Sequence, residues 1–182
     1  MILLRHLFFL HLCLLLALSG CGAPETQPSY TVIGTADGAP EDCSAEKVAE
    51  QLDQLGRAIN EKDLNLVLEF FDGGPFQWYS MGEAATSTTS ERDFVAYTLD
   101  DLEAYFSEQF EQDENWELVE LYVNSWDAGR GLVHFGPAHI RRTANDLSDE
   151  LGGADNLTEG KGAYHCASKT FIVLSLGMNL EE

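Results

Sequence analysis

The chain has 182 residues and carries 31 Asp and Glu against 10 Lys and Arg, which gives a formal net charge of −21 at pH 7. A surface this acidic repels nucleic-acid phosphates and anionic head groups, so the charge excludes nucleic acid as a partner of the folded domain. The acidic residues are spread along the chain rather than clustered. Solubility, or repulsion screened by a salty exterior, therefore explains the charge more simply than a cationic partner or divalent ions.

The beginning of the chain has the pattern of a secretory signal peptide. A cation, Arg5, precedes an apolar block at residues 7–18. This block is too short to span a bilayer comfortably, and it contains His11. Residues 1–20 are therefore expected to be removed as a signal peptide.

The run Leu18-Ser19-Gly20-Cys21 resembles the lipobox of bacterial lipoproteins. In that family the cysteine thiol takes a diacylglycerol, and cleavage leaves the cysteine as the lipidated first residue. The resemblance implies that Cys21 is the lipidation site. It also implies that the chain is anchored to the bilayer of the cell membrane or outer membrane and faces the periplasm or the exterior. An ordinary signal peptide cleaved nearby, with Cys21 a chance thiol, is the alternative.

Two cysteines remain for the exported domain. Cys13 leaves with the signal peptide and Cys21 takes the lipid, so Cys43 and Cys166 are left. Two thiols in an exported chain favour one disulfide between them. Two separate buried thiols stay open as the alternative, because the sequence does not show whether their Cα atoms come within about 7 Å.

Composition divides the mature chain in two. Residues 21–42 hold the lipidated cysteine and a run of Pro, Gly, Thr and acidic residues without periodicity, which predicts a flexible tether. Tyr30, Val32 and Ile33 are the exception, because they could add a short strand to a sheet edge. Residues 43–182 are long enough for one domain with its own core.

Three amphipathic helices are expected in this domain. Ser44 is placed to cap a helix whose apolar residues recur at helical spacing up to Ile59. Asp63 caps a second, shorter helix that ends before Gly73-Gly74-Pro75. The run beginning at Thr98 has the spacing of a capping box and opens a third helix.

Aromatic and β-branched runs predict three hairpins. The expected strands pair as residues 76–81 with 94–97, residues 116–126 with 131–142, and residues 161–167 with 170–176. Between the last two hairpins, an acidic and Gly-containing segment holds Leu147 and Leu151 at the spacing of one short helix.

The run Asp127-Ala128-Gly129-Arg130 sets the expected register of the central hairpin. A tight turn centred between Ala128 and Gly129 places Val123 opposite His134. Because side chains alternate along a strand, this register predicts two faces that are both apolar. One face carries Val119, Leu121, Val123, Leu132 and His134, and the other carries Leu118, Tyr122, Trp126, Val133 and Phe135.

The order of these elements, with the run Ala58-Ile59-Asn60-Glu61-Lys62-Asp63-Leu64, resembles the nuclear transport factor 2-like (NTF2-like) superfamily of SnoaL-like proteins and ketosteroid isomerases. The resemblance covers about residues 44–177. It implies a cone-shaped α+β fold in which a strongly bent, mostly antiparallel sheet wraps the first helix and a pocket opens between them. The outer sheet face of such proteins often mediates dimers. Members include enzymes, ligand binders and interaction domains, so the fold alone does not select a function.

The face expected to line the cone contains the candidate for chemistry. His134 lies there among apolar residues, as a His or Asp projects into the pocket of the dehydratases and isomerases that this fold resembles. Asp72, Asp127 and Glu69 are acids available as its partner, and the spacing selects none of them. A histidine satisfied by one hydrogen bond in a mixed core is the alternative.

Binding residues are expected on both faces of the sheet. The pocket wall is predicted to consist of Trp78, Val119, Leu121, Val123 and His134. An apolar patch on the outer face is predicted to consist of Leu118, Tyr122, Trp126 and Phe135. The pocket would take a small apolar molecule, and the patch would form a homodimer or be covered by the tether. Aromatic residues such as Trp78 are more often core than ligand contacts, and that alternative stays open.

The sequence predicts no metal and no cofactor. His134, His139 and His165 are not at ligand spacing, and the cysteines are expected to pair. A P-loop, a dinucleotide fingerprint and a Gly-x-Ser-x-Gly motif are all absent from the sequence.

These observations favour a non-catalytic, lipid-anchored extracytoplasmic domain that binds a small apolar ligand or an envelope protein. The alternative is a lyase, isomerase or hydrolase of the ketosteroid isomerase or scytalone dehydratase type, with His134 as general base. A third hypothesis is a structural role in which the acidic domain hydrates or spaces the envelope.

Overall fold

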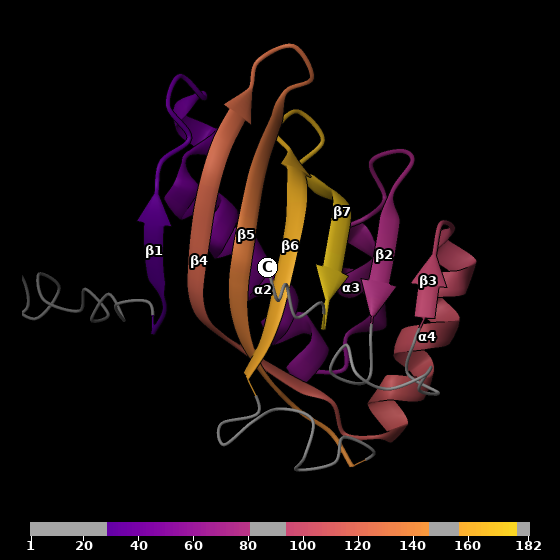
Figure 1. The fold of residues 1–182 in the computed structure, drawn as a ribbon. Helices are drawn as coiled ribbons and strands as arrows, with labels where there is room; N and C mark the ends of the chain where they lie inside the picture. The colour runs from indigo at the N-terminus through magenta and orange to yellow at the C-terminus, as the bar shows by residue number, and fades with distance from the viewer. Residues whose placement is uncertain (1–28, 81–93, 146–156, 178–182) are drawn as a thin grey trace, which may run out of the picture.

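One seven-stranded sheet forms the frame of the computed structural model, which describes residues 29–80, 94–145 and 157–177 (Figure 1). The strands are β1 (Thr31–Gly34), β2 (Gln77–Ser80), β3 (Phe94–Ala96), β4 (Asn115–Asp127), β5 (Leu132–Thr143), β6 (Leu157–His165) and β7 (Thr170–Leu176). Across the sheet they are ordered β1-β4-β5-β6-β7-β2-β3. The three expected hairpins, β2–β3, β4–β5 and β6–β7, are all present as antiparallel pairs.

Helices cover one face of this sheet. They are the 3₁₀ turn η1 (Glu41–Cys43), α2 (Ala45–Asn60), α3 (Leu64–Glu69) and α4 (Leu99–Glu111). Figure 1 shows α2 behind β4, β5 and β6, with α4 beside β3 at the far edge. The three expected helices are confirmed, and the whole is a mixed α+β fold with a large, strongly bent, unclosed sheet. In the ranges that the structure describes, no helix combines the length and the apolar character needed to cross a membrane.

Each α-helix begins at the capping residue that the sequence predicted. The side chains of Ser44, Asp63 and Thr98 each accept a hydrogen bond from the backbone N–H three residues later. Thr98 Oγ1 also donates to Asp101 Oδ2 at 2.7 Å, so the expected capping box closes through side chains. These bonds satisfy donors that the start of a helix otherwise leaves open.

A strand lies inside the segment that was expected to be a flexible tether. β1 runs parallel to β4 and adds to the edge of the sheet, with Val32 opposite Leu121. The sequence had left open a short edge strand here, because the residues near Ile33 are apolar. The domain therefore extends back at least to Thr31.

Other expected features lie outside the described residues. They are the signal peptide at residues 1–20, the lipidated Cys21 and the short helix at residues 147–151.

The register of the central hairpin differs from the expected one. Ser125 lies opposite His134, whereas the sequence placed Val123 there. The reason is the connection between the strands, because residues 128–131 all lie in the loop. The sequence instead predicted that the second strand begins at residue 131, directly after a tight turn at residues 127–130.

Bulges then change which face each side chain of this hairpin occupies. The β4–β5 register shifts between Leu118 and Glu120 and again on both sides of Val123. In β5 a cis peptide joins Gly136 to Pro137, where the β5–β6 register also shifts. Each bulge turns the side chains beyond it to the opposite face, so a single alternation along the strand fails.

The core lies between α2 and the sheet face that the helices cover. The buried stripe of α2 includes Val48, Leu52, Leu55 and Ile59, as its spacing predicted. The facing core residues of β4 and β5 are Trp116, Leu118, Leu121, Val123, Val133, Phe135, Ala138 and Ile140.

Candidate functional site

Aromatic side chains fill the interior in which the sequence predicted a pocket. Trp78 is at the centre of this cluster, with its ring centroid 5.2 Å from that of Phe106 and 5.9 Å from that of Trp116. Trp78 and Leu121 have relative exposures of 0%. A side chain without accessible surface cannot line an open pocket, so these two belong to the packed core. Val123 is buried beside them.

His134 does not project into this interior. With Val133 and Phe135 in the core, the alternation of β5 places His134 on the outer face of the sheet, between Ser125 of β4 and Ala163 of β6. In the described residues its side chain makes no hydrogen bond or ion pair with Asp72, Asp127 or Glu69. The acid–base pair considered from the sequence is therefore not assembled, because the bulge between Val123 and Ser125 turns the residues beyond it, and His134 opposite them, to the outer face.

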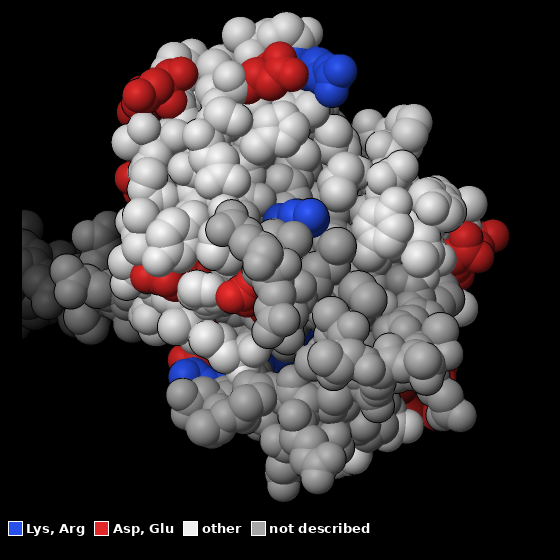
Figure 2. All heavy atoms as spheres, viewed as in Figure 1, with Lys and Arg blue, Asp and Glu red and all other residues white. Residues whose placement is uncertain are grey.

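The predicted interface patch is also divided by the true register. Leu118 and Phe135 are core residues, and Trp126 is partly buried against the core. Tyr122 alone of the four keeps its expected place on the outer face, where its ring lies 5.9 Å from that of His139. On the part of this face that Figure 2 shows, charged side chains are scattered among uncharged ones rather than gathered into one patch.

His139 lies on the outer face between two carboxylates. Its Nδ1 is 3.0 Å from Glu120 Oε2, and its Nε2 is 3.6 Å from Glu159 Oε1. Both ring nitrogens thus face an acidic partner. Among the described residues, no group of three or more His, Cys, Asp and Glu side chains is arranged to hold a metal ion.

A buried ion pair closes one end of the interior. Arg142 on β5 donates from Nη2 to Glu114 Oε1 at 2.7 Å, and Trp116 Nε1 donates to the same oxygen at 2.6 Å. Arg142 Nη2 also lies 3.4 Å from Tyr105 Oη, which donates to Ser80 Oγ at 2.7 Å. Residues of α4, β2, β4 and β5, with Glu114 just before β4, are therefore joined by one polar network.

Charge pairing keeps this network ionised. Burial is the largest single influence and lowers the pKa of Arg142, but the charge of Glu114, the charge of Tyr105 and the hydrogen bonds to both groups together outweigh burial and hold the pKa above its ordinary value. The Arg142–Glu114 pair was not predicted from the sequence, although the position of Arg142 indicates a buried charge. Arg142 follows Ile140 at the alternating, inward position of a strand, where a charged residue needs a buried partner.

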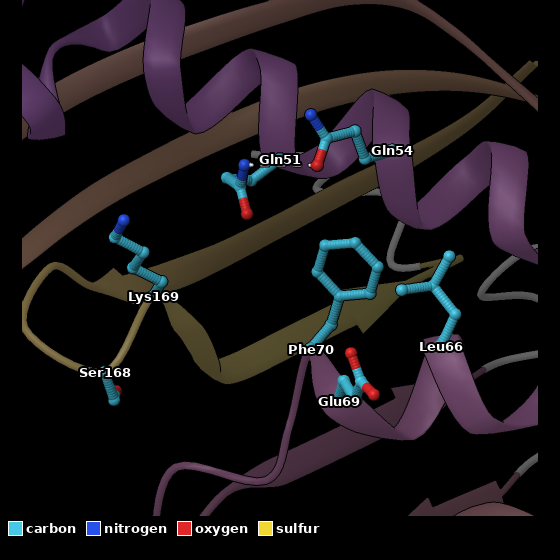
Figure 3. A pocket seen from close by; sticks show the side chains of 7 residues that line it. All are labelled: Gln51, Gln54, Leu66, Glu69, Phe70, Ser168 and Lys169. Carbon is cyan, nitrogen blue, oxygen red and sulfur yellow. Dashed lines mark hydrogen bonds between the residues drawn. The ribbon is translucent and has the colours of Figure 1, made fainter.

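An open pocket of about 280 Å³ lies elsewhere, between two helices and the β6–β7 turn (Figure 3). Its walls are Gln51 and Gln54 of α2, Leu66, Glu69 and Phe70 at α3, and Ser168 and Lys169 of the turn. We call it the α2–α3 pocket. Figure 3 shows the two carboxamides facing Phe70 and Leu66 across the opening, with Lys169 toward one end. Of these residues, the sequence analysis had singled out only Glu69, as a possible partner for His134.

The carboxamide wall follows from the amphipathic pattern of α2. Leu52 and Leu55 are buried against the sheet, so Gln51 and Gln54 lie at the edge of the buried stripe. Gln51 Nε2 donates to Gln54 Oε1 at 3.3 Å, which orients both amides. Glu50 Oε1 accepts from Gln54 Nε2 at 3.4 Å and orients the second amide further.

A chain of three polar side chains fixes the turn wall. His165 Nδ1 lies 2.7 Å from Ser168 Oγ, and Ser168 Oγ lies 2.7 Å from Thr170 Oγ1. The backbone of Gly73 approaches so closely that an added Cβ would clash with both hydroxyl oxygens. No acid contacts the His165 ring in the described residues. Among the described residues, these hydrogen-bonded side chains therefore include a nucleophile, Ser168, and a base, His165, but not the orienting acid of a catalytic triad.

The expected disulfide is confirmed, and it joins two walls of the pocket. Cys43, just before α2, is bonded to Cys166 at the β6–β7 turn, with Cα atoms 5.7 Å apart and a sequence separation of 123. Cys43 is fully buried. The start of α2 and the turn that carries Ser168 and Lys169 are thus held together covalently.

Comparison with known proteins finds similarity only to solved structures of low sequence identity. No protein-family model and no curated protein matches the sequence. A candidate calcium/calmodulin dependent protein kinase II association domain from Xanthomonas campestris matches with a TM-score of 0.50 and 15% identity, over 84% of this chain and 98% of that one. An NTF2-like protein of unknown function from Cytophaga hutchinsonii matches with a TM-score of 0.38 and 10% identity, over 70% and 86% of the two chains.

A third solved structure, from Methylobium petroleophilum PM1, is described as a protein of unknown function with a cystatin-like fold. It matches with a TM-score of 0.46 and 11% identity, over 74% of this chain and 76% of that one. The α+β architecture expected from the sequence, with a strongly bent sheet packed against helices, is confirmed by the structure itself. Identities this low carry no statement about function.

Proposed function

We propose that this protein is a lipid-anchored extracytoplasmic domain that binds a small polar molecule in the α2–α3 pocket without transforming it. One contrast carries the proposal. Among the described residues, the side chains expected to line an interior pocket are buried, whereas the α2–α3 pocket presents two carboxamides, a hydroxyl, a carboxylate and an ammonium around a partly apolar floor. Concave sites with a few fixed polar groups are where proteins usually hold small molecules.

The proposed ligand is polar because the expected apolar wall is part of the core. Trp78, Leu121 and Val123 were expected to face the ligand and are instead buried. Of the pocket residues, only Leu66 and Phe70 are apolar, and the Phe70 ring is largely covered. A purely apolar ligand would strip water from the polar groups without replacing their hydrogen bonds, which costs affinity.

Two features support an exported and anchored location. Cys21 ends the lipobox-like run, and the Cys43–Cys166 disulfide suits an oxidising compartment outside the cytoplasm. Feeding labelled palmitate to bacteria that express the full chain tests the anchor. Label in the wild-type protein and none in a Cys21→Ala variant supports the anchor, whereas equal labelling of both, or none, contradicts it.

A ligand screen tests the binding function. The thermal midpoint of the full chain in detergent is measured with amino acids, short peptides, sugars and polyamines, and separately with steroids and fatty acids. We expect a compound of the polar set to raise the midpoint of the wild type. A Gln51→Trp variant, whose indole occupies the pocket, should lose this response.

A Gln77→Trp variant is the matched control, because Gln77 is exposed on β2 and is not part of the pocket wall. It should respond as the wild type does. Stabilisation by apolar compounds alone, an unchanged response in Gln51→Trp, or no response to any compound would each contradict the proposal. Turnover of a bound compound would contradict the non-catalytic role.

A further inference from the structure

The pocket charges narrow the ligand class, given the proposed binding function. We infer that the α2–α3 pocket takes a short zwitterionic peptide, with the ligand carboxylate at Lys169 and the ligand ammonium at Glu69. Lys169 is the one cation and Glu69 the one anion of the pocket wall. Neither makes an ion pair with another side chain among the described residues, so both charges are available to a ligand.

Charge matching favours a zwitterion over a singly charged ligand. An anion would meet Lys169 but leave Glu69 unmatched, and the net charge of −21 would oppose its approach. A simple cation would meet Glu69, but Lys169 in the same pocket would repel it. Acidic groups over the rest of the surface would also compete with the pocket for it. A zwitterion pairs both pocket charges and carries no net charge of its own.

The carboxamides between these charges match a peptide group. A glutamine side chain offers two N–H donors and one carbonyl acceptor, which is the complement of a peptide C=O and N–H. The bond from Gln51 Nε2 to Gln54 Oε1 aligns the two amides, and Figure 3 shows them side by side above the opening. Opposite them, the exposed Leu66, next to the largely covered Phe70 ring, provides a small apolar surface for a ligand side chain.

The cationic end of the pocket is held in place before a ligand arrives. Ser168 is fixed by His165 and Thr170, and the turn is tied to the start of α2 through Cys166. Lys169 follows directly, with a backbone φ of 60° that the turn imposes. Positions that are ordered in advance reduce the entropy lost when a small ligand binds.

Titration of the full chain in detergent with the dipeptide L-alanyl-L-leucine tests the inference. N-acetylation of the dipeptide removes its ammonium, and amidation removes its carboxylate. Each modification should weaken binding about tenfold, because each removes one charge-assisted contact. In a Lys169→Gln variant the free and amidated peptides should bind alike, and in Glu69→Gln the free and acetylated peptides should bind alike.

Lys161→Gln is the matched control, because Lys161 lies on β6 outside the pocket wall. It should retain the preference for free termini. Equal binding of all three peptides to the wild type, or a preference that survives Lys169→Gln, overturns the inference. If the wild type binds glucose but no peptide, and Gln51→Trp does not bind glucose, the inference of a peptide ligand is overturned. The proposed binding function of the pocket then still holds. If no probe binds, both fail.

Discussion

Arg142 and Glu114 form an ion pair inside the protein, with Nη2 of Arg142 2.7 Å from Oε1 of Glu114 and side-chain exposures of 2% and 0%. Two charges removed from water stabilise a fold only while each satisfies the other, and loss of one partner leaves a buried charge. On the outer face of the same strands, Arg141 and Glu117 make an exposed pair, with exposures of 42% and 53%. The neighbouring pairs provide a natural comparison.

Breaking the buried pair should cost far more stability than breaking the exposed one. Arg142→Met should lower the free energy of unfolding by about 3–5 kcal/mol, because the buried Glu114 carboxylate loses the positive charge of Arg142. Arg141→Met should cost about 1 kcal/mol or less. Urea unfolding followed by tryptophan fluorescence measures both. Similar losses in the two variants would show that the inner pair is solvated.

The disulfide should stabilise both the fold and the pocket. For a closed loop of 123 residues, the chain-entropy model gives a contribution of about 5 kcal/mol to the free energy of unfolding. A Cys43→Ala/Cys166→Ala variant should unfold at lower urea and should bind the pocket ligand more weakly, because α2 and the turn are no longer tied. Dithiothreitol should reproduce this in the wild type and leave the variant unchanged. A stability loss with full ligand affinity would separate the disulfide from the pocket.

Replacing Gly73 or Gly56 by alanine should change the stability of the protein in opposite directions. At Gly73 a Cβ would clash with Thr170 and Ser168, so Gly73→Ala should destabilise the protein and disturb the turn wall. At Gly56, inside α2, the nearest atom to a Cβ is Trp116 Cβ at 3.5 Å, an ordinary contact. Gly56→Ala should therefore stabilise by about 0.5–1 kcal/mol through helix propensity. Thermal unfolding of both variants measures the signs, and equal signs would contradict this packing.

Stability at high pH should depend on Tyr164. Burial, with a further contribution from the charge of Asp42, raises the pKa of the Tyr164 phenol from 10.0 to about 12. The folded protein therefore keeps the phenolic proton more tightly than the unfolded chain does. The resulting stabilisation is complete below pH 10 and disappears as the pH rises through 12.

Tyr164→Phe removes this titrating group. Between pH 10 and 12 the wild type should lose stability more steeply than the variant, as measured by the urea midpoint at each pH. Parallel curves for the two proteins would show that the Tyr164 phenol ionises alike in the folded and unfolded states.

Local patterns were sufficient to predict the helices and the order of elements. Ser44, Asp63 and Thr98 cap the helices as expected, because a cap depends on residues only three positions apart. The strands were also found, but not their exact pairing. The loop at residues 128–131 moves the pairing of the central hairpin by two residues, and the bulges after Leu118 and Val123 turn side chains to the other face. Neither the loop nor the bulges have a clear sequence signal.

The α2–α3 pocket could not have been assembled from sequence patterns. Its walls come from residues near 52, 68 and 168, and their approach depends on the sheet that carries β7 beside β2. The Cys43–Cys166 pair was the one sequence feature that brought two of these walls together. Arg142 could have been recognised as a buried charge from its inward position, but its partner Glu114 precedes the strand and follows no alternation.

NMR of the isotope-labelled full chain in detergent shows directly whether a ligand binds in the α2–α3 pocket or inside the cone. Amide and side-chain signals are recorded while L-alanyl-L-leucine is added. Binding in the α2–α3 pocket should give saturable shifts at Gln51, Gln54 and Lys169 and leave the indole signals of Trp78 and Trp116 unchanged. Shifts concentrated at the two indoles, with the pocket signals unmoved, would place the ligand inside the cone and rule out binding in the α2–α3 pocket.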